Sequence, residues 1–426
     1  MAGRCMLFVS ALVFAAAAHA APSRDSLDAA ARDYVRLQLA IGQKEDGYID
    51  AYYGPAKLKA EGEKIAKTED LKQLARRVDA LTGRVRVLQA SQPDRARFLL
   101  AQLKAAQTRL RMLQGEKLSF EDEAEGLFGV RPQLKPLSSY DPVLACIEKL
   151  VPGEGALADR VDAFQERFVI ARDRLKPVFD AAIAGCKART ARHIALPAAE
   201  RFDLSFVTGK SWSGYNYYQG DYHSRIEVNT DLPVRISRAV DLGCHEGYPG
   251  HHVLNALLEE KLTRGKGWIE FSVYPLYSPQ SFIAEGTANY GIDLAFPGAE
   301  KLAFETNTLY PLAGLSTAEA ARYDELLQAM KDLNGARLTI SRDFLDGRIT
   351  EQQAVELERK YRLSSEARAR QSVAFTKQYR SYVINYGLGE QMVKDDVESR
   401  PDPTARWKRF EQIISGPTLP SDLKAQ

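Results

Sequence analysis

Apolar residues recur at three- and four-residue steps through the first half of the chain, which is the spacing of helices that bury one face. The clearest run lies near the N-terminus, where the apolar positions are Leu27, Ala31, Tyr34, Leu37 and Ile41. The same spacing predicts helices over residues 95–113, 144–150 and 161–184. We therefore expect the first half of the protein to be helical.

The pattern changes after Pro197, where residues that favour strands become common. Residues 202–208 and 217–230 are rich in aromatic and β-branched side chains. Within residues 222–230, the apolar Ile226 and Val228 alternate with the polar positions Arg225, Glu227 and Asn229. This alternation predicts a half-buried strand.

Helical spacing returns in the last third of the chain, over residues 317–344 and 364–387. Between them, Thr350 and Gln353 have the spacing of a capping box at a helix start. We predict a mainly α fold with a small β-sheet. We expect one unit over residues 21–426, in which residues 21–196 form a helical part and residues 197–426 a second part.

The first twenty residues have the features of a signal peptide. Arg4 supplies a positive end, residues 6–18 are almost wholly apolar, and Ala18-His19-Ala20 fits a cleavage site before Ala21. The apolar run falls short of the roughly 20 residues that a membrane span needs. We therefore predict an exported protein, periplasmic or secreted, without stable membrane insertion.

Composition and charge narrow the class of protein. The 426 residues are 45% hydrophobic and 27% charged, which is ordinary for a globular protein with a sizeable core. Lysine and arginine number 58 against 56 acidic residues, and no basic stripe with interleaved aromatics is present. We therefore expect no nucleic-acid partner.

Three of the four cysteines remain after the predicted cleavage: Cys146, Cys186 and Cys244. An exported protein can form a disulfide. Because Cys244 precedes a histidine motif and is expected to pack beside it, Cys146 and Cys186 are the pair that we expect if one forms.

Three of the six histidines lie within eight residues, in His245-Glu246-Gly247-Tyr248-Pro249-Gly250-His251-His252. Zinc hydrolases use neutral imidazoles to hold the ion and a carboxylate to take a proton from the attacking water. A regular HExxH helix places its two histidines one turn apart. Here Pro249 occupies the position of the second histidine, so a regular helix cannot form this site.

A local bulge resolves the difficulty. On a straight helix His252 would lie about 10 Å along the axis from His245, and His251 would face about 120° away. Proline and glycine both permit departures from regular helix. If Pro249 and Gly250 bulge out, His251 takes the place of the second histidine. We favour this two-residue bulge and expect His251 as the second ligand. His252 is the alternative, if the bulge takes three residues.

The third ligand of such a site must come from elsewhere in the chain. Residues 281–292 have helical spacing, and Glu285 lies there among small residues that would let another helix approach closely. A glutamate from a following helix would complete a His-His-Glu site with one open position. An ordinary surface acid of that helix is the alternative.

The motif HExxPGHH, followed by Glu-Gly-x-Ala-x-Tyr, resembles the bacterial family catalogued as domain of unknown function 885. Its arrangement of zinc ligands and general base is similar to that of gluzincin metallopeptidases. The resemblance covers roughly residues 200–390. It implies His245, one histidine of the 251–252 pair and Glu285 as Zn²⁺ ligands, with Glu246 as general base. The chain departs from the family pattern at Leu254 and Ile292.

Further side chains are candidates for contacts with a substrate. Gluzincin-like enzymes often stabilise the oxyanion with a phenol or an imidazole. Tyr386, Tyr382 and His223 are candidates for that role, and Arg380 is a candidate carboxylate clamp. The strand over residues 222–230 would bind an extended substrate at a sheet edge, with Arg225 and Asn229 as contacts. The alternatives are core packing for the tyrosines and a purely structural strand.

These residues predict a zinc-dependent, metallopeptidase-like hydrolase whose small sheet lies beside the active cleft. Glu246 would assist the attack of a metal-activated water on a peptide bond. One alternative is a non-catalytic metal-binding protein of the same fold. Another is a zinc hydrolase that acts on other amide bonds, such as those of cell-wall fragments.

Overall fold

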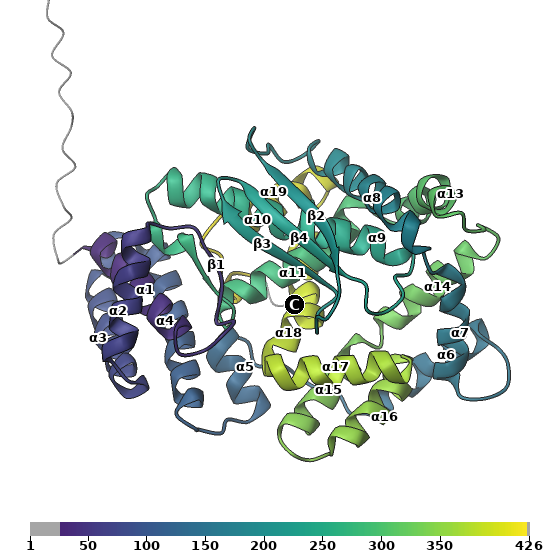
Figure 1. Ribbon diagram of the computed structural model, residues 1–426, viewed down its shortest axis with the longest axis horizontal. Coiled ribbons are helices and arrows are strands. Elements are labelled where there is room, and N and C mark those ends of the chain that lie inside the picture. The colour runs from purple at the N-terminus through teal and green to yellow at the C-terminus, as the bar shows by residue number, and fades with distance from the viewer. Residues whose placement is uncertain (1–25, 424–426) are drawn as a thin grey trace, which may run out of the picture.

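The computed structural model describes residues 26–423, and most of these residues are helical (Figure 1). The predicted signal peptide lies outside the described residues. The α-helices are α1 (Leu27–Gly42), α2 (Ala56–Thr68), α3 (Leu71–Leu88), α4 (Pro93–Leu113), α5 (Phe120–Phe128), α6 (Asp141–Leu150), α7 (Leu157–Gln165), α8 (Leu175–Thr190), α9 (Ser237–Leu242), α10 (His251–Leu258), α11 (Pro279–Ala295), α12 (Glu300–Phe304), α13 (Tyr310–Ala313), α14 (Ala320–Lys331), α15 (Asn334–Leu345), α16 (Glu351–Arg362), α17 (Glu366–Tyr379), α18 (Ile384–Glu398) and α19 (Pro403–Ile414).

The strands form two small sheets, so the prediction of a mainly α fold with little sheet is confirmed. The strands are β1 (Ile49–Tyr52), β2 (Arg201–Val207), β3 (Gly214–Gly220), β4 (His223–Asn229) and β5 (Val273–Pro275). In the three-stranded sheet the order is β2-β4-β3, with β2 and β4 parallel and β3 antiparallel to β4. The short strands β1 and β5 pair with each other, and no sequence pattern predicted either of them.

Strand β4 matches the alternation predicted for residues 222–230. Ser224, Ile226 and Val228 are buried, as one face of a half-buried strand requires. The expected position at a sheet edge is wrong, however, because β4 lies between β2 and β3. The edge strands of this sheet are β2 and β3.

Three long predicted helices are each interrupted in the structure. Residues 161–184 divide into α7 and α8. Two 3-10 turns separate these helices, and in the short stretch between the turns Ile170 N–H donates to the Val234 carbonyl at 2.9 Å. Residues 317–344 divide into α14 and α15. Residues 364–387 break after α17, at Arg380, whose φ is +56°. Periodicity predicted the helical content of these segments but not the breaks.

The capping box predicted from the sequence is present in the structure. The predicted box at the start of α16 is present, with the Thr350 side chain accepting from Gln353 N–H and the Gln353 side chain accepting from Thr350 N–H. A second box, formed by Asp70 and Gln73, begins α3. Each box satisfies two amide donors that the first helical turn leaves unpaired.

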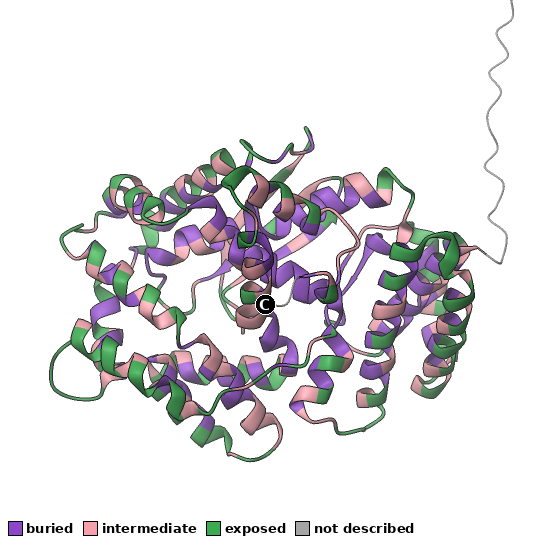
Figure 2. Ribbon diagram, turned by 180° about the vertical axis from the view of Figure 1, so that it is seen from behind, coloured by how far each residue is buried: buried purple, intermediate pink, exposed green. Residues whose placement is uncertain are grey.

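Buried residues are concentrated in the middle of the molecule and on the inward faces of the outer helices (Figure 2). One apolar cluster joins α1–α5 to residues of the second half, including Val273, Phe282 and Tyr382. A buried ion pair between Arg95 of α4 and Glu270 also links the halves, with Nε to Oε1 at 2.5 Å. No helix within residues 26–423 has the length and apolar content to cross a membrane.

The expected pairing of Cys146 with Cys186 is wrong. Cys186 of α8 forms a disulfide with Cys244, and their Cα atoms are 5.4 Å apart, while Cys146 is free and exposed. The reason is packing, because α8 lies against the segment that precedes the histidine motif. Cys244 is therefore held away from any ligand role.

This pairing predicts the thiol chemistry of the folded protein. Peptide mapping without reduction should recover residues 186 and 244 linked, with Cys146 as the thiol that an alkylating reagent labels. Replacing both bonded cysteines by serine should lower the free energy of unfolding by up to about 4 kcal/mol, because the bond closes a loop of 58 residues. A linked peptide that contains Cys146 would contradict the pairing.

Candidate metal centre

The histidine motif does not form a regular helix. Residues Gly243–Gly247 form a single π-helical turn, η5, and α10 begins at His251. Between them the chain folds back tightly: the Tyr248–Pro249 peptide is cis, and Gly250 N–H donates to the Cys244 carbonyl at 3.0 Å. A β-carbon at Gly250 would lie 1.8 Å from the His245 carbonyl oxygen, so this close return of the chain requires glycine.

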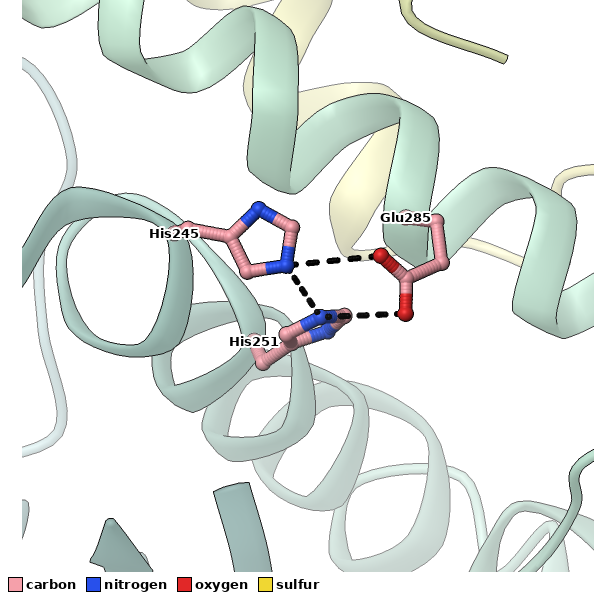
Figure 3. A group of neighbouring side chains, drawn as sticks. All are labelled: His245, His251 and Glu285. Atoms are coloured by element: carbon pink, nitrogen blue, oxygen red, sulfur yellow. Dashed lines mark hydrogen bonds and ion pairs between the residues drawn. The ribbon is translucent and has the colours of Figure 1, made fainter. Parts of the chain in front are cut away.

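This return brings His251, and not His252, opposite His245. The two Nε2 atoms are 3.2 Å apart (Figure 3). The geometry therefore corresponds to the two-residue bulge. His252 points elsewhere: its Nδ1 lies 2.8 Å from the Ser224 hydroxyl and its Nε2 lies 2.9 Å from a Glu200 carboxylate oxygen. Because both of its nitrogens are engaged, His252 is not available as a ligand.

Glu285 approaches the two histidines from α11. Its oxygens lie 3.3 Å from His245 Nε2 and 3.6 Å from His251 Nε2, and all three side chains point toward one another (Figure 3). The candidate ligand atoms lie within 4.8 Å of each other. Tyr382 donates a hydrogen bond of 2.7 Å to Glu285 Oε1, which fixes the orientation of the carboxylate.

The donor set fits a small divalent cation. Zinc with bonds of about 2 Å in a tetrahedral site needs donor atoms roughly 3–3.5 Å apart, and two imidazoles with a carboxylate are typical ligands. Glu285 Oε2 is buried and makes no well-aligned hydrogen bond among residues 26–423, although His245 Nε2 lies 3.3 Å from it. Such an atom is costly to bury unless a cation or donor meets it.

Electrostatics at the site favours positive charge. Burial alone would raise the pKa of Glu285, but the His251 and His245 imidazoles outweigh burial and hold that pKa well below its usual range. Burial likewise opposes protonation of His251, but the Glu285 carboxylate outweighs it and raises the pKa of His251 to about 9. The group therefore holds a buried negative charge that a proton or a metal cation can compensate.

Glu246 lies beside this group with its carboxylate unengaged. No hydrogen bond or ion pair to that carboxylate is present within the described part of the chain. The Glu246 backbone carbonyl accepts from Asn216 Nδ2 at 2.8 Å, and the carboxylate lies against the backbone of Gly214. Burial raises the pKa of Glu246. A positioned carboxyl with a raised pKa is suited to accept and return a proton.

Two adjoining cavities open at the centre, and both are lined by His245, Glu246 and Tyr386. The larger has a volume of about 460 Å³ and the smaller about 70 Å³. His251 and Glu285 line the smaller cavity. The Tyr386 hydroxyl has no hydrogen-bond partner among residues 26–423, so of the two predicted tyrosines it is the one free to meet a ligand. The Tyr382 hydroxyl is bound to Glu285.

The remaining predicted contacts lie outside both cavities. His223 is at the start of β4, where its Nε2 pairs with Asp203 at 2.9 Å. Arg380 follows α17 and directs its guanidinium to the buried Glu123 at 2.7 Å. In both cases a carboxylate from a distant part of the chain determines the orientation, which sequence spacing could not indicate. The structure therefore does not bring these two residues to the candidate centre.

The two predicted contacts on β4 are also structural. Arg225 lies over the Tyr217 ring at 4.7 Å and pairs with Glu227 at 3.4 Å. Asn229 Nδ2 donates to the carbonyls of Lys210 and Trp212, each at 2.9 Å. Neither residue lines either of the two cavities. Asn229 instead supports the loop before β3, whose Trp212 does line both cavities.

Several cavity residues were not found from the sequence. Asp50 of β1 and Tyr215 of β3 line the smaller cavity, and the Tyr215 hydroxyl donates to the Asp50 carboxylate. Burial raises the pKa of Asp50 to about 6. Asp50 has no local signal, since it comes from the N-terminal helical part. Gly214 does have one, because an isolated glycine in a strand often marks a close approach.

No family model matches the chain, and no curated protein matches it significantly. The fold is similar to that of a candidate lipoprotein from Colwellia psychrerythraea, with a TM-score of 0.52 and 15% identity over 85% of this chain and 68% of that one. A candidate lipoprotein of unknown function from Shewanella oneidensis aligns with a TM-score of 0.43 and 14% identity, over 91% and 73% of the two chains. At this identity the first likeness concerns the fold alone.

The tight return at Gly250 predicts a specific sensitivity. Gly250→Ala should lower the free energy of unfolding by at least about 2 kcal/mol, because the new methyl group would overlap the His245 carbonyl. Gly83→Ala is the matched control, since a β-carbon on that helical glycine meets nothing within 4 Å. The control should be neutral or stabilising by up to about 1 kcal/mol. Chemical denaturation of both variants checks this, and equal stabilities would contradict the described geometry.

Proposed function

We propose that the protein is a zinc-dependent, metallopeptidase-like hydrolase. The observation that supports this most is the convergence of His245, His251 and Glu285 beside the unengaged Glu246 carboxylate, in contact with a cavity. The motif's resemblance to domain of unknown function 885 and to gluzincin peptidases supports the same reaction class. His245, His251 and Glu285 would hold the ion.

A bound zinc ion would supply Lewis-acid chemistry, lowering the pKa of water and polarising a carbonyl group. Glu246 would take the proton of the attacking water and return it to the leaving amine. Tyr386, which lines both cavities, would donate a hydrogen bond from its hydroxyl to the developing oxyanion. Tyr382 would act indirectly, by holding Glu285 in place.

The surroundings support a small, extended substrate. The edge strand β3 lines both cavities through Gly214, and such an edge offers main-chain groups for pairing with a peptide. A cavity of about 460 Å³ lies within the range that holds a drug-sized ligand. Short peptides are therefore the proposed substrates. Other amides, such as those of cell-wall fragments, are the alternative within the same chemistry.

Export is part of the proposal. The predicted signal peptide and the fold shared with a candidate lipoprotein both support a place outside the cytoplasm. A disulfide between Cys186 and Cys244 is compatible with an oxidising compartment.

Metal content tests the ligand set. The purified protein should bind about one zinc per chain, and His251→Ala or Glu285→Ala should lose most of it, because a site with two of its three protein ligands binds far more weakly. His252→Gln should retain the metal, since both of its nitrogens already have protein partners. His223→Gln serves as a control for a histidine outside the cavities. If His251→Ala retains zinc and His252→Gln loses it, His252 and not His251 is the second histidine ligand.

Glu246→Gln separates an enzyme from a metal-binding protein. The variant keeps the size of the side chain and removes the base, so it should retain zinc and fold while peptide hydrolysis falls by at least about a hundredfold. Turnover of a mixed peptide library, with metal analysis of each sample, measures this. A fully metallated wild type that cleaves no peptide would favour the binding protein or another amide substrate. Equal activity of both proteins would show that Glu246 is not the base.

A further inference from the structure

The larger cavity holds an unusual excess of positive charge. Six basic side chains line it, against three acidic ones that include Glu246. Three of the six basic side chains are arginines contributed one each by α15, α16 and α17, the helices grouped below the sheet in Figure 1. We call Arg337, Arg362 and Arg368 the arginine cluster. The cluster and the candidate metal centre therefore share one cavity.

The other three basic residues of this cavity have carboxylate partners. Lys301 pairs with Asp241 at 3.0 Å, and Arg238 contacts the same residue at 3.4 Å. Lys331 pairs with Asp293 at 2.9 Å. Their charges are therefore compensated within the protein, and they serve as an internal comparison for the cluster.

The arginine cluster lacks such compensation within the described residues. Arg337 forms no ion pair, and its Nε is buried without a hydrogen-bond partner. Arg368 has one hydrogen bond, to the Pro233 carbonyl at 2.8 Å. Arg362 has only Glu358, at 3.9 Å. Glu358 also acts on Arg337 from a distance, and the carboxylates that act on Arg368, Asp162 and Glu166, are paired with Arg235. Within the described residues, none of the three guanidinium groups thus has a close carboxylate partner.

Holding Arg337 there is unfavourable in the absence of a ligand. Burial and then the neighbouring Arg362 lower the pKa of Arg337 to about 10. Its guanidinium lies over the rings of Phe375 at 5.3 Å and Tyr386 at 5.7 Å, which orient it but do not neutralise it. Arg337 is partly buried, so its uncompensated charge is held partly out of water at a cost, and an anion that binds there recovers some of this cost. Guanidinium groups bind carboxylates with paired, directional hydrogen bonds.

We infer that the arginine cluster binds a carboxylate of the substrate, so that the protein takes short peptides that present a C-terminal carboxylate or an acidic side chain near the bond to be cleaved. The identification of the ligand as a peptide rests on the proposed function. The binding of an anion by the cluster does not depend on hydrolysis. The arginine cluster lies in the same cavity as Glu246. The carboxylate that it binds would therefore belong to the substrate molecule itself and not to a separate effector.

Equilibrium binding tests the inference without turnover. Zinc-loaded protein with Glu246→Gln would be titrated calorimetrically with N-acetyl-tetraalanine, with its C-terminal amide, and with N-acetyl-Ala-Ala-Glu-Ala amide. The free acid, the glutamate peptide or both should bind at least about tenfold more tightly than the tetraalanine amide, which is the gain expected from a charge-assisted hydrogen bond. Preference for the first identifies a terminal carboxylate, and preference for the second identifies a side chain.

Arginine variants assign the preference to the cluster. Arg337→Gln should reduce it to less than about threefold while binding of the amide changes little. Arg362→Gln, at a partly exposed position, is the second variant in case Arg337→Gln does not fold. Arg370→Gln is the control. Arg370 lies on α17, as the cluster's Arg368 does, but it is exposed and pairs with Glu366 at 2.6 Å. The control should keep the full preference.

Equal binding of acid and amide forms would overturn the inference, as would failure of all three peptides to bind. So would a cluster variant that folds and keeps the preference. Failure of the proposed function has a different signature: wild type that discriminates among the peptides through Arg337 but hydrolyses none of them. In that case the anion site would stand and the hydrolytic assignment would fall.

Discussion

The candidate centre depends on the return of the chain over the His245 carbonyl. Two histidines six residues apart cannot share an ion on a regular helix, because the intervening backbone separates them along the axis. Here a π-helical turn ends at Gly247, and Gly250 passes so close to the His245 carbonyl that no β-carbon fits. The imidazoles of His245 and His251 face each other as a result, and every later feature of the site is built around that pair.

A second close approach places the third group. Helices α11 and α18 meet at Gly286 and Gly389, where an added β-carbon on Gly286 would lie 2.6 Å from the facing backbone. This contact holds Glu285 at the histidines and brings Tyr386, at the start of α18, to the cavity wall. Contact at the backbone leaves little freedom for either helix to shift, which is the rigidity that a metal or catalytic site requires. The small residues around Glu285 are therefore part of how the site is positioned.

The sequence predicted features that depend on neighbouring residues and failed where distant partners decide. The bulge at Pro249-Gly250 follows from local backbone chemistry, so His251 could be favoured over His252 in advance. Arg380 and His223 lie outside both cavities, and Glu123 and Asp203, far away in the chain, determine their orientation. Cys186 was given the wrong partner for the same reason. Asp50 and Arg337 have no motif at all, and only the packing of distant elements brings them to the cavities.

The two halves of the cavity system carry opposite charge, and this arrangement bears on substrate choice. Three carboxyl groups gather around the candidate metal ligands: Glu246 and Glu285 are buried there, and Asp50 is partly buried. Across the larger cavity the arginine cluster is positive. A cation would offset the first region, and a substrate carboxylate would offset the second.

A ligand that carries an anionic group at one end would therefore be drawn in with a single orientation, with its neutral amide toward Glu246. Orientation of this kind lowers the entropic cost of reaching a reactive geometry.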